Sequence, residues 1–200
     1  MKISHVLVLF ALLSVSLQAQ DRISIGAKAG LNISNIYDSE GETYSADAKT
    51  GFAAGGFLHI PLGGFFGIQP EVMFSQKGYQ TSGSLLSTSR TSNFLDFPIL
   101  LAIKPLGLAT LLIGPQYSYL LKQTTNVVTP VSNTTTVDEF TNDNIRRNTL
   151  GLVVGADANL LQFVISGRVA WDLYDNNGDG TSTTPRYKNV NGQLTLGLRF

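Results

Sequence analysis

Five charged residues stand in the middle of segments in which apolar and polar residues alternate: Lys28, Glu71, Asp96, Arg168 and Arg199. Side chains of a strand alternate between its two faces, so each charge shares a face with glycine, alanine and polar residues. If that face lines a narrow interior, the charges must pair, because an isolated buried charge is strongly unfavourable. We therefore expect a structural network of ion pairs; a conduit for ions or protons built from the same residues is the alternative.

Catalytic chemistry has little support in the sequence. The chain has two histidines, His5 and His59, and no cysteine. His5 falls in a segment that we expect to be removed, and one histidine near a strand end builds neither a Ser-His-Asp triad nor a histidine metal site. The absence of cysteine excludes a disulfide framework, a thiolate metal site and a cysteine nucleophile. The sequence thus predicts a protein that is not an enzyme and uses no cofactor.

One polar segment resembles the beginning of a calcium-binding loop. Asp175, Asn177 and Asp179, followed by Gly180, have the D-x-N-x-D-G spacing. The twelfth position is Arg186, where a bidentate glutamate is needed. An EF-hand is therefore not expected. A weak calcium site in a surface loop remains an alternative to a turn-rich loop without metal.

The first 19 residues have the pattern of a secretory signal peptide, with Lys2, an apolar run at residues 6–17 and expected cleavage after Ala19. The apolar run is too short to cross a bilayer as a helix, which takes about 20 residues. Residues 20–200 then form one exported domain. The formal net charge of the chain is zero, which gives no indication of a nucleic-acid partner.

The rest of the chain alternates with period two, the pattern of strands. Eight strands are expected, at residues 23–33, 51–60, 65–77, 93–103, 108–121, 148–158, 163–174 and 189–200. Long polar connections alternate along the chain with short ones. The long connections are 34–50, 78–92, 122–147 and 175–188, and the short ones are 61–64, 104–107 and 159–162. An up-and-down meander places all long loops at one end and all short turns at the other.

Even strand number, short turns at one end and long loops at the other are typical of an outer-membrane barrel. We therefore expect an all-β, eight-stranded, antiparallel, up-and-down transmembrane β-barrel with short periplasmic turns and long extracellular loops. The polar face would point into a lumen that is only wide enough for side chains, and the apolar face would contact lipid. The alternative is a soluble, secreted, lipocalin-like barrel that binds a small apolar ligand, with an apolar interior and a polar exterior.

Three prolines, Pro70, Pro98 and Pro115, lie inside expected strands. Each lacks a backbone donor, which normally confines proline to edge strands or bulges. Since a closed barrel has no edges, we expect a bulge or a bend at each proline.

Four segments carry a resemblance to a known family: "GAKAGLN" (26–32), "IQPEVMFSQKG" (68–78), "FLDFPILLAIKP" (94–105) and "GPQYSYLL" (114–121). They resemble the PorT-like outer-membrane β-barrel proteins of Gram-negative Bacteroidota. The resemblance implies an outer-membrane location and insertion by the general barrel-assembly machinery. It also implies that a final strand with Leu196, Leu198 and Phe200 on one face is similar to the signal that this machinery reads.

The expected function follows from the expected architecture. Because the sequence contains no recognisable set of catalytic residues, we expect an integral outer-membrane protein with a structural, adhesion or secretion-associated role. Outer-membrane lipid surrounds the barrel, and a protein partner could bind the extracellular loops. The sequence does not select among these roles.

Overall fold

The computed structural model describes residues 23–37, 46–82, 87–129, 132–138, 146–176 and 187–200. Nine strands are present among them: β1 (Ser24–Tyr37), β2 (Asp47–Gly63), β3 (Phe66–Ser82), β4 (Ser87–Leu106), β5 (Ala109–Val128), β6 (Asn133–Asp138), β7 (Asn148–Leu160), β8 (Phe163–Asp172) and β9 (Lys188–Arg199). No helix in these ranges is long and apolar enough to cross a membrane.

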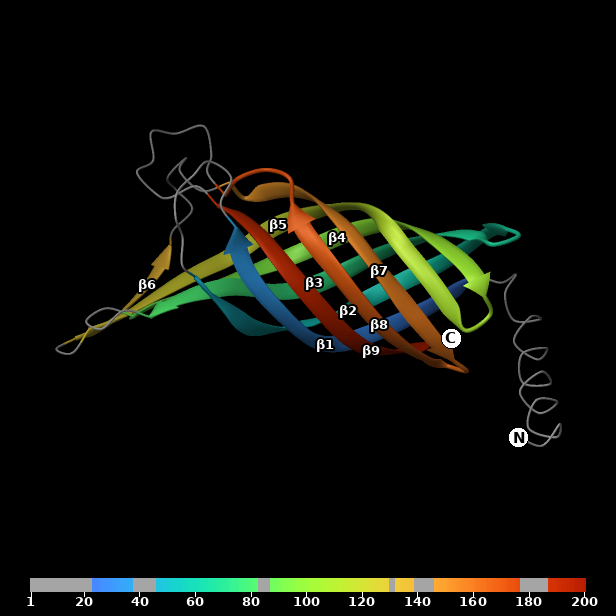
Figure 1. The fold of residues 1–200 in the computed structure, drawn as a ribbon, viewed down its shortest axis with the longest axis horizontal. Helices are drawn as coiled ribbons and strands as arrows, with labels where there is room; N and C mark the ends of the chain where they lie inside the picture. Colours follow the sequence, from blue (N-terminus) through green and yellow to red (C-terminus); the bar gives the residue numbers. More distant parts are fainter. Residues whose placement is uncertain (1–22, 38–45, 83–86, 130–131, 139–145, 177–186) are drawn as a thin grey trace, which may run out of the picture.

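Eight of the strands close into an antiparallel barrel (Figure 1). Each pairs with its neighbours in the chain, except that β5 pairs with β7 and the first strand, β1, pairs with the last, β9. The closing seam continues beyond β9, where Ile25 and Phe200 exchange backbone hydrogen bonds of 3.2 and 2.8 Å. The expected eight-stranded up-and-down barrel is therefore confirmed, and closure leaves its wall without an open edge.

The strands at the long-loop end extend further than expected. β4 begins at Ser87 and β5 ends at Val128, so both reach into stretches expected to be loops. The stretch 122–147 also contains β6, which pairs with β5 and lies outside the barrel. The loop prediction for these residues was wrong because it followed the apolar alternation, whereas threonine and valine favour strands with or without an apolar face.

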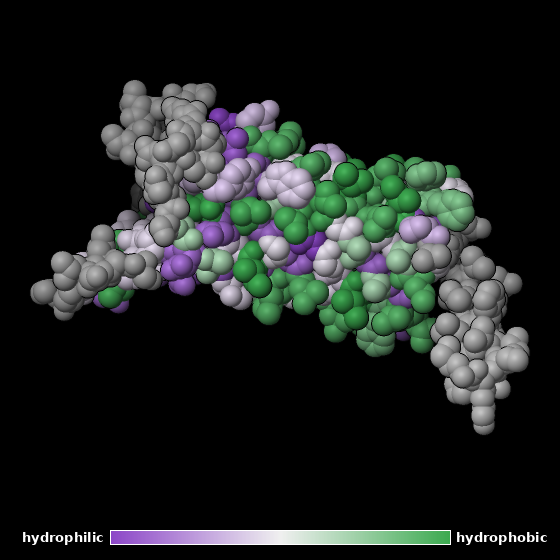
Figure 2. All heavy atoms as spheres, viewed as in Figure 1, coloured by the Kyte–Doolittle hydropathy of each residue, from purple (hydrophilic) through white to green (hydrophobic). Residues whose placement is uncertain are grey.

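The two faces of the barrel wall differ as expected. Leu31, Ile33 and Leu194 point outward with 57, 61 and 62% of their surface exposed, whereas Lys28 and Glu71 point inward and are 4% exposed. Figure 2 shows the visible outer wall covered mostly by apolar side chains. A soluble barrel would need the opposite arrangement, so the lipocalin-like alternative was wrong.

The lumen is not polar throughout. Five buried apolar residues line its wall on β4, β5, β7 and β8, and they form one cluster: Leu100, Ala102, Leu112, Val153 and Ala170. The charged side chains come mainly from β1, β3 and β8. The interior therefore contains an apolar cluster among charged and polar side chains and is filled by side chains, as an eight-stranded barrel allows.

The prolines interrupt the ladders without shifting them. Between β3 and β4 the register is the same on both sides of Pro98, and between β4 and β5 it is the same on both sides of Pro115. Pro70 likewise leaves the β2 to β3 register unchanged. The expected bulges were wrong: each proline lacks one donor toward one neighbour, and the surrounding ladder keeps the alignment.

Candidate functional site

The centre of the lumen holds three charged side chains in contact. Lys28 Nζ lies 2.7 Å from Glu71 Oε1, and Arg168 Nη1 lies 2.7 Å from Glu71 Oε2. Arg168 Nη2 also donates to Glu71 Oε1 at 3.2 Å, so the guanidinium binds the carboxylate in a bidentate manner. The side chain of Glu71 is 0% exposed. We call these three residues the lumen triad.

Glycines make the lumen triad possible. Lys28 on β1 stands between Gly55 of β2 and Gly197 of β9 in the strand register. An added Cβ at Gly197 would stand 2.8 Å from the Lys28 Cβ, so the glycine leaves room for the lysine, whose side chain extends across β2 to Glu71 on β3. Arg168 similarly lies opposite Gly155, where an added Cβ would stand 2.7 Å from the Arg168 Cβ. Long cations and small neighbours therefore occur together.

Polar side chains add hydrogen bonds to the lumen triad, although Arg168 Nε is buried without a partner. Gln69 Nε2 donates to Glu71 Oε1 at 3.0 Å and lies 3.3 Å from Asp157 Oδ2. Ser166 Oγ accepts from Arg168 Nη2 at 3.0 Å. The Lys28 ammonium also lies 5.2 Å from the centre of the Phe57 ring. Glu71 thus accepts from three side chains, which offsets the cost of burying its charge.

A second ion pair lies nearer the long-loop end. Asp96 Oδ1 is 3.2 Å from Lys77 Nζ, and the same ammonium lies 4.7 Å from the centre of the Phe94 ring. Asp96 was expected to share the network of Glu71, but it pairs with Lys77 instead. Lys77 and Asp96 lie on the inward faces of the adjacent strands β3 and β4, and the cations Lys28 and Arg168 are both bound by Glu71.

Arg199 is placed apart from the lumen triad, near the short-turn end. Its Nη1 donates to Asn159 Oδ1 at 3.1 Å, and Asn159 Nδ2 donates to Thr110 Oγ1 at 2.9 Å. Of the five charges expected to form one network, the structure therefore joins three. Asp96 and Arg199 each belong to a separate cluster along the lumen.

An apolar cluster covers the lumen at the long-loop end. Ile36, Tyr79 and Tyr187 are buried together, with Ala46 packed against them. The two tyrosine rings meet edge to face with centroids 5.4 Å apart, and Arg90 Nη1 donates to the Tyr187 hydroxyl at 3.2 Å. We call Ile36, Tyr79 and Tyr187 the mouth cluster. Packed rings thus lie inside the barrel at the long-loop end, beside the charged part of the lumen.

Two charged lumen residues that matter here, Lys77 and Asp157, were not among the expected site residues. Both have the signal that identified the others, a charge on the small or polar face of an alternating segment. Lys77 stands at the end of its expected strand and was assigned to no partner. The alternation could have found both residues, but not their contacts.

Metal binding has no support in the described ranges. No group of three or more histidine, cysteine, aspartate or glutamate residues there could hold a metal ion. His59 points inward and is buried on β2. The calcium candidate falls largely outside the described residues: Asp175 is described, whereas Asn177 and Asp179 are not.

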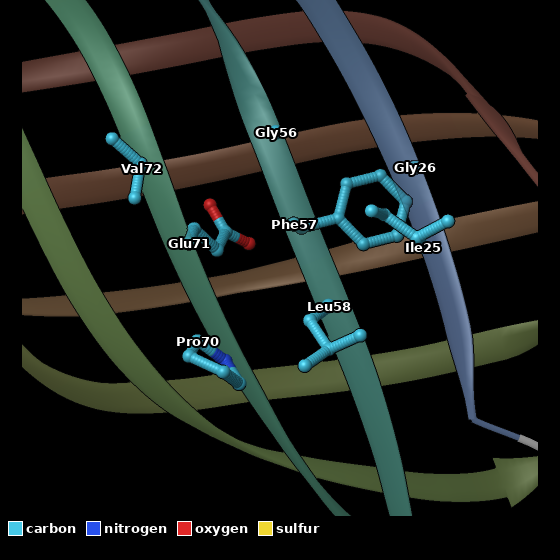
Figure 3. A pocket seen from close by; sticks show the side chains of 8 residues that line it. All are labelled: Ile25, Gly26, Gly56, Phe57, Leu58, Pro70, Glu71 and Val72. Atoms are coloured by element: carbon cyan, nitrogen blue, oxygen red, sulfur yellow. The ribbon is translucent and has the colours of Figure 1, made fainter.

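The lipid-facing wall beside the lumen triad has an apolar hollow of about 360 Å³ (Figure 3). It lies over β1, β2 and β3, and its lining includes Ile25, Leu58, Pro70 and Val72. Small Gly56 and the ladder interruption at Pro70 leave this space. Because the Glu71 side chain is fully buried behind the wall, the hollow offers a ligand only apolar contacts.

A closed antiparallel barrel with an apolar exterior, a charged interior and short turns at one end defines an integral outer-membrane barrel. The family comparison agrees: residues 18–177 match the model of the outer membrane protein beta-barrel domain. The chain belongs to this family. A comparison with curated proteins finds no match.

Solved structures show the same fold at low sequence identity. The chain is similar to Ail, the attachment invasion locus protein of Yersinia pestis, at 13% identity and a TM-score of 0.55, covering 88% of this chain and 98% of Ail. The chain is also similar to Neisserial surface protein A, at 9% identity and a TM-score of 0.52, covering 89% of this chain and 97% of that protein. A major outer membrane protein from Thermus thermophilus is 15% identical with a TM-score of 0.50, and the match covers 90% of this chain and 100% of that protein.

Proposed function

We propose that this outer-membrane barrel is neither a channel nor an enzyme and acts through its extracellular end, in an adhesion, structural or secretion-associated role. The observation that carries the proposal is the filled lumen. The buried lumen triad, the apolar cluster around Leu100 and Leu112 and the mouth cluster occupy successive parts of the interior. In the part of the lumen that the structure describes, this packing argues against a water-filled path and against a substrate pocket.

The strands that continue beyond the barrel support a role at the long-loop end. A transmembrane strand needs about 9–11 residues, whereas β4 and β5 have 20 residues each. In barrels of this class the short turns are periplasmic and the long loops extracellular. The excess length therefore extends outside the cell, where a partner protein would bind.

Two resemblances add support for a surface role. The name of Ail describes attachment and invasion, which is an adhesion function for a barrel of the same fold. The PorT-like segments resemble outer-membrane barrels of Bacteroidota, which keeps a secretion-associated role among the proposed roles without selecting it. Export would be directed by residues 1–19 as a signal peptide, followed by the barrel at 20–200.

The outward row of β9 is proposed to be read by the barrel-assembly machinery. Leu196, Leu198 and Phe200 are exposed on the outer wall, and Phe200 has 72% of its surface exposed. We expect Phe200→Ala to lower the assembled fraction in cells several-fold, because the side chain would be recognised during insertion. Assembly is measured by heat-modifiability gels of outer-membrane fractions.

Phe163→Ala is the matched control for Phe200, since Phe163 is also exposed and lies beside Leu198 at the same end of the barrel. Refolding of both purified variants in detergent should match the wild type. If Phe200→Ala assembles in cells as well as Phe163→Ala, the aromatic is not a recognition signal.

Planar-bilayer recordings test the filled lumen. We expect no steady single-channel current from the wild type, and none from Glu71→Gln, because glutamine keeps the volume of the side chain that fills the centre. A large steady current from Glu71→Gln would contradict the proposal. It would show that the lumen triad holds a conduit closed instead of filling a closed barrel.

A further inference from the structure

The three-stranded sheet that projects from the barrel consists of β4 residues 87–92, β5 residues 123–128 and β6 (Figure 1). The ladder between β5 and β7 ends at the pair of Tyr119 and Asn148. Beyond that point β6 takes the place of β7 beside β5. Among the described residues β6 pairs with β5 alone, so its other side is a sheet edge.

The turn before β6 determines which of its backbone groups face that edge. Thr129 and Ser132 exchange both backbone hydrogen bonds, at 2.8 and 3.4 Å. In an antiparallel ladder such pairs alternate with pairs that do not exchange hydrogen bonds. Thr134 and Thr136 therefore bond to β5, opposite Val127 and Thr125. Asn133, Thr135 and Val137 direct their N–H and C=O groups to the open edge.

β6 has six residues and ends at Asp138, but residues 133–137 lack the charges, prolines and bulges that usually protect an exposed strand. Residues 133–137 contain no lysine, no other charge and no proline. Their pairing with β5 runs without a register shift, and their side chains are exposed. Charges, prolines and bulges normally prevent such an edge from pairing with another chain. Three outward-facing residues in a regular strand thus form a template for a further strand.

We propose that the edge of β6 binds an extended segment of a partner protein, which adds a strand to the projecting sheet. Main-chain hydrogen bonds supply the attraction in this binding mode, and alternate side chains supply selectivity. The surroundings here are uncharged threonine, asparagine and valine, which fit a partner segment rich in uncharged β-branched residues. The inference rests on the proposed function, because it names the kind of partner that the extracellular end takes.

A second copy of the chain is a poorer occupant than another protein. Copies inserted in one membrane share the same orientation, so the components of their β6 strands along the membrane normal run in the same direction. This favours parallel pairing between two such edges, which is somewhat weaker per residue than antiparallel pairing. An independent extended segment can approach in either direction.

Proline substitution tests the edge selectively. Thr135→Pro with Val137→Pro removes two donors that face the edge but keeps those of Thr134 and Thr136, which bond to β5. Proline is tolerated in an edge strand when its missing N–H would face solvent. The matched control, Thr135→Ala with Val137→Ala, removes the side chains but keeps both edge donors.

The probe is a fluorescent peptide of sequence Lys-Thr-Val-Thr-Val-Thr-Val-Lys, titrated against the full-length mature protein in lipid nanodiscs and followed by anisotropy. We expect the double proline variant to bind about tenfold or more weakly than the wild type, since each backbone hydrogen bond contributes several-fold to an equilibrium. The double alanine variant should stay within about threefold, because its main-chain donors remain. Heat-modifiability gels verify that every variant is folded.

Equal binding by the wild type and the double proline variant would overturn the inference, as would the absence of binding to the wild type. Cross-linking of two copies through β6 without peptide would identify the chain itself as occupant and would also overturn it. These results are separable from the proposed function. A barrel that conducts no current and does not bind the peptide contradicts only the proposed strand addition at β6. A conducting barrel that binds the peptide refutes only the filled lumen.

Discussion

Glu71→Ala is expected to lower the free energy of unfolding by about 3–5 kcal/mol, the usual effect of removing one partner from a buried ion pair. The substitution leaves Lys28 and Arg168 as two buried cations without the carboxylate that both contact. Their mutual repulsion then adds to the cost of their burial. Urea unfolding in phospholipid vesicles, followed by the fluorescence of Trp171, the one tryptophan of the chain, measures the change.

Two further variants separate charge from volume. Replacing the whole lumen triad, with Lys28→Met, Glu71→Leu and Arg168→Met, should recover part of the lost stability, because both cations are removed together with their carboxylate. The recovery is incomplete because the buried Asp157 then keeps only its hydrogen bond from Gln69. Asp96→Ala should cost less than Glu71→Ala, since it leaves a single cation, Lys77, over the ring of Phe94. If Glu71→Ala unfolds at the wild-type urea concentration, water compensates the cations and the lumen triad is not structural.

The lumen triad also shows where sequence reasoning succeeds and where it ends. Alternation placed Lys28, Glu71 and Arg168 on inward faces, because a strand has only two faces and the apolar one was evident. Which charges meet depends on strand register and on the size of the residues between them. Lys28 reaches Glu71 across β2, and this contact becomes visible only once β1, β2 and β3 are aligned.

Asp96 illustrates the same limit from the other side. It lies on β4, adjacent to β3, which carries Glu71, and the two carboxylates were expected to share one network. In the structure Lys77, also on β3, pairs with Asp96 at 3.2 Å. The two clusters lie at different positions along the barrel axis. The alternation of residues predicts which face a side chain occupies, but not its position along the axis.

For the fold, strand number and order were predictable, whereas the projecting sheet was not. Seven of the connections could be sorted by length and polarity, and this sorting predicted the meander. β6 was missed because exposed threonine-rich strands have no apolar face to reveal them. The pairing of β6 with β5 depends on β-branched side chains and on the hydrogen-bonded pair Thr129 and Ser132. In the sequence these signals are weaker than the alternation of apolar residues that marks a lipid-facing strand.

Leu194→Arg is expected to lower the free energy of unfolding in a bilayer by about 2–4 kcal/mol, the cost of a lipid-facing arginine near the membrane midplane. Leu194 points outward from β9 with 62% of its surface exposed, and it lies opposite Leu31 of β1 and Gly167 in the middle of β8. The arginine cannot be paired there without dragging water into the hydrocarbon. Vesicle unfolding followed by Trp171 fluorescence again provides the measurement.

The depth of the substituted residue is the control that makes this result specific to lipid. Leu62 is exposed to a similar extent, 59%, but lies beside the short turn between β2 and β3. Leu62→Arg should cost only about 0–1 kcal/mol, because its guanidinium reaches the polar interface. Equal effects at the two positions would contradict a membrane-spanning wall, since the cost of an exposed arginine depends on its depth only when lipid surrounds the barrel.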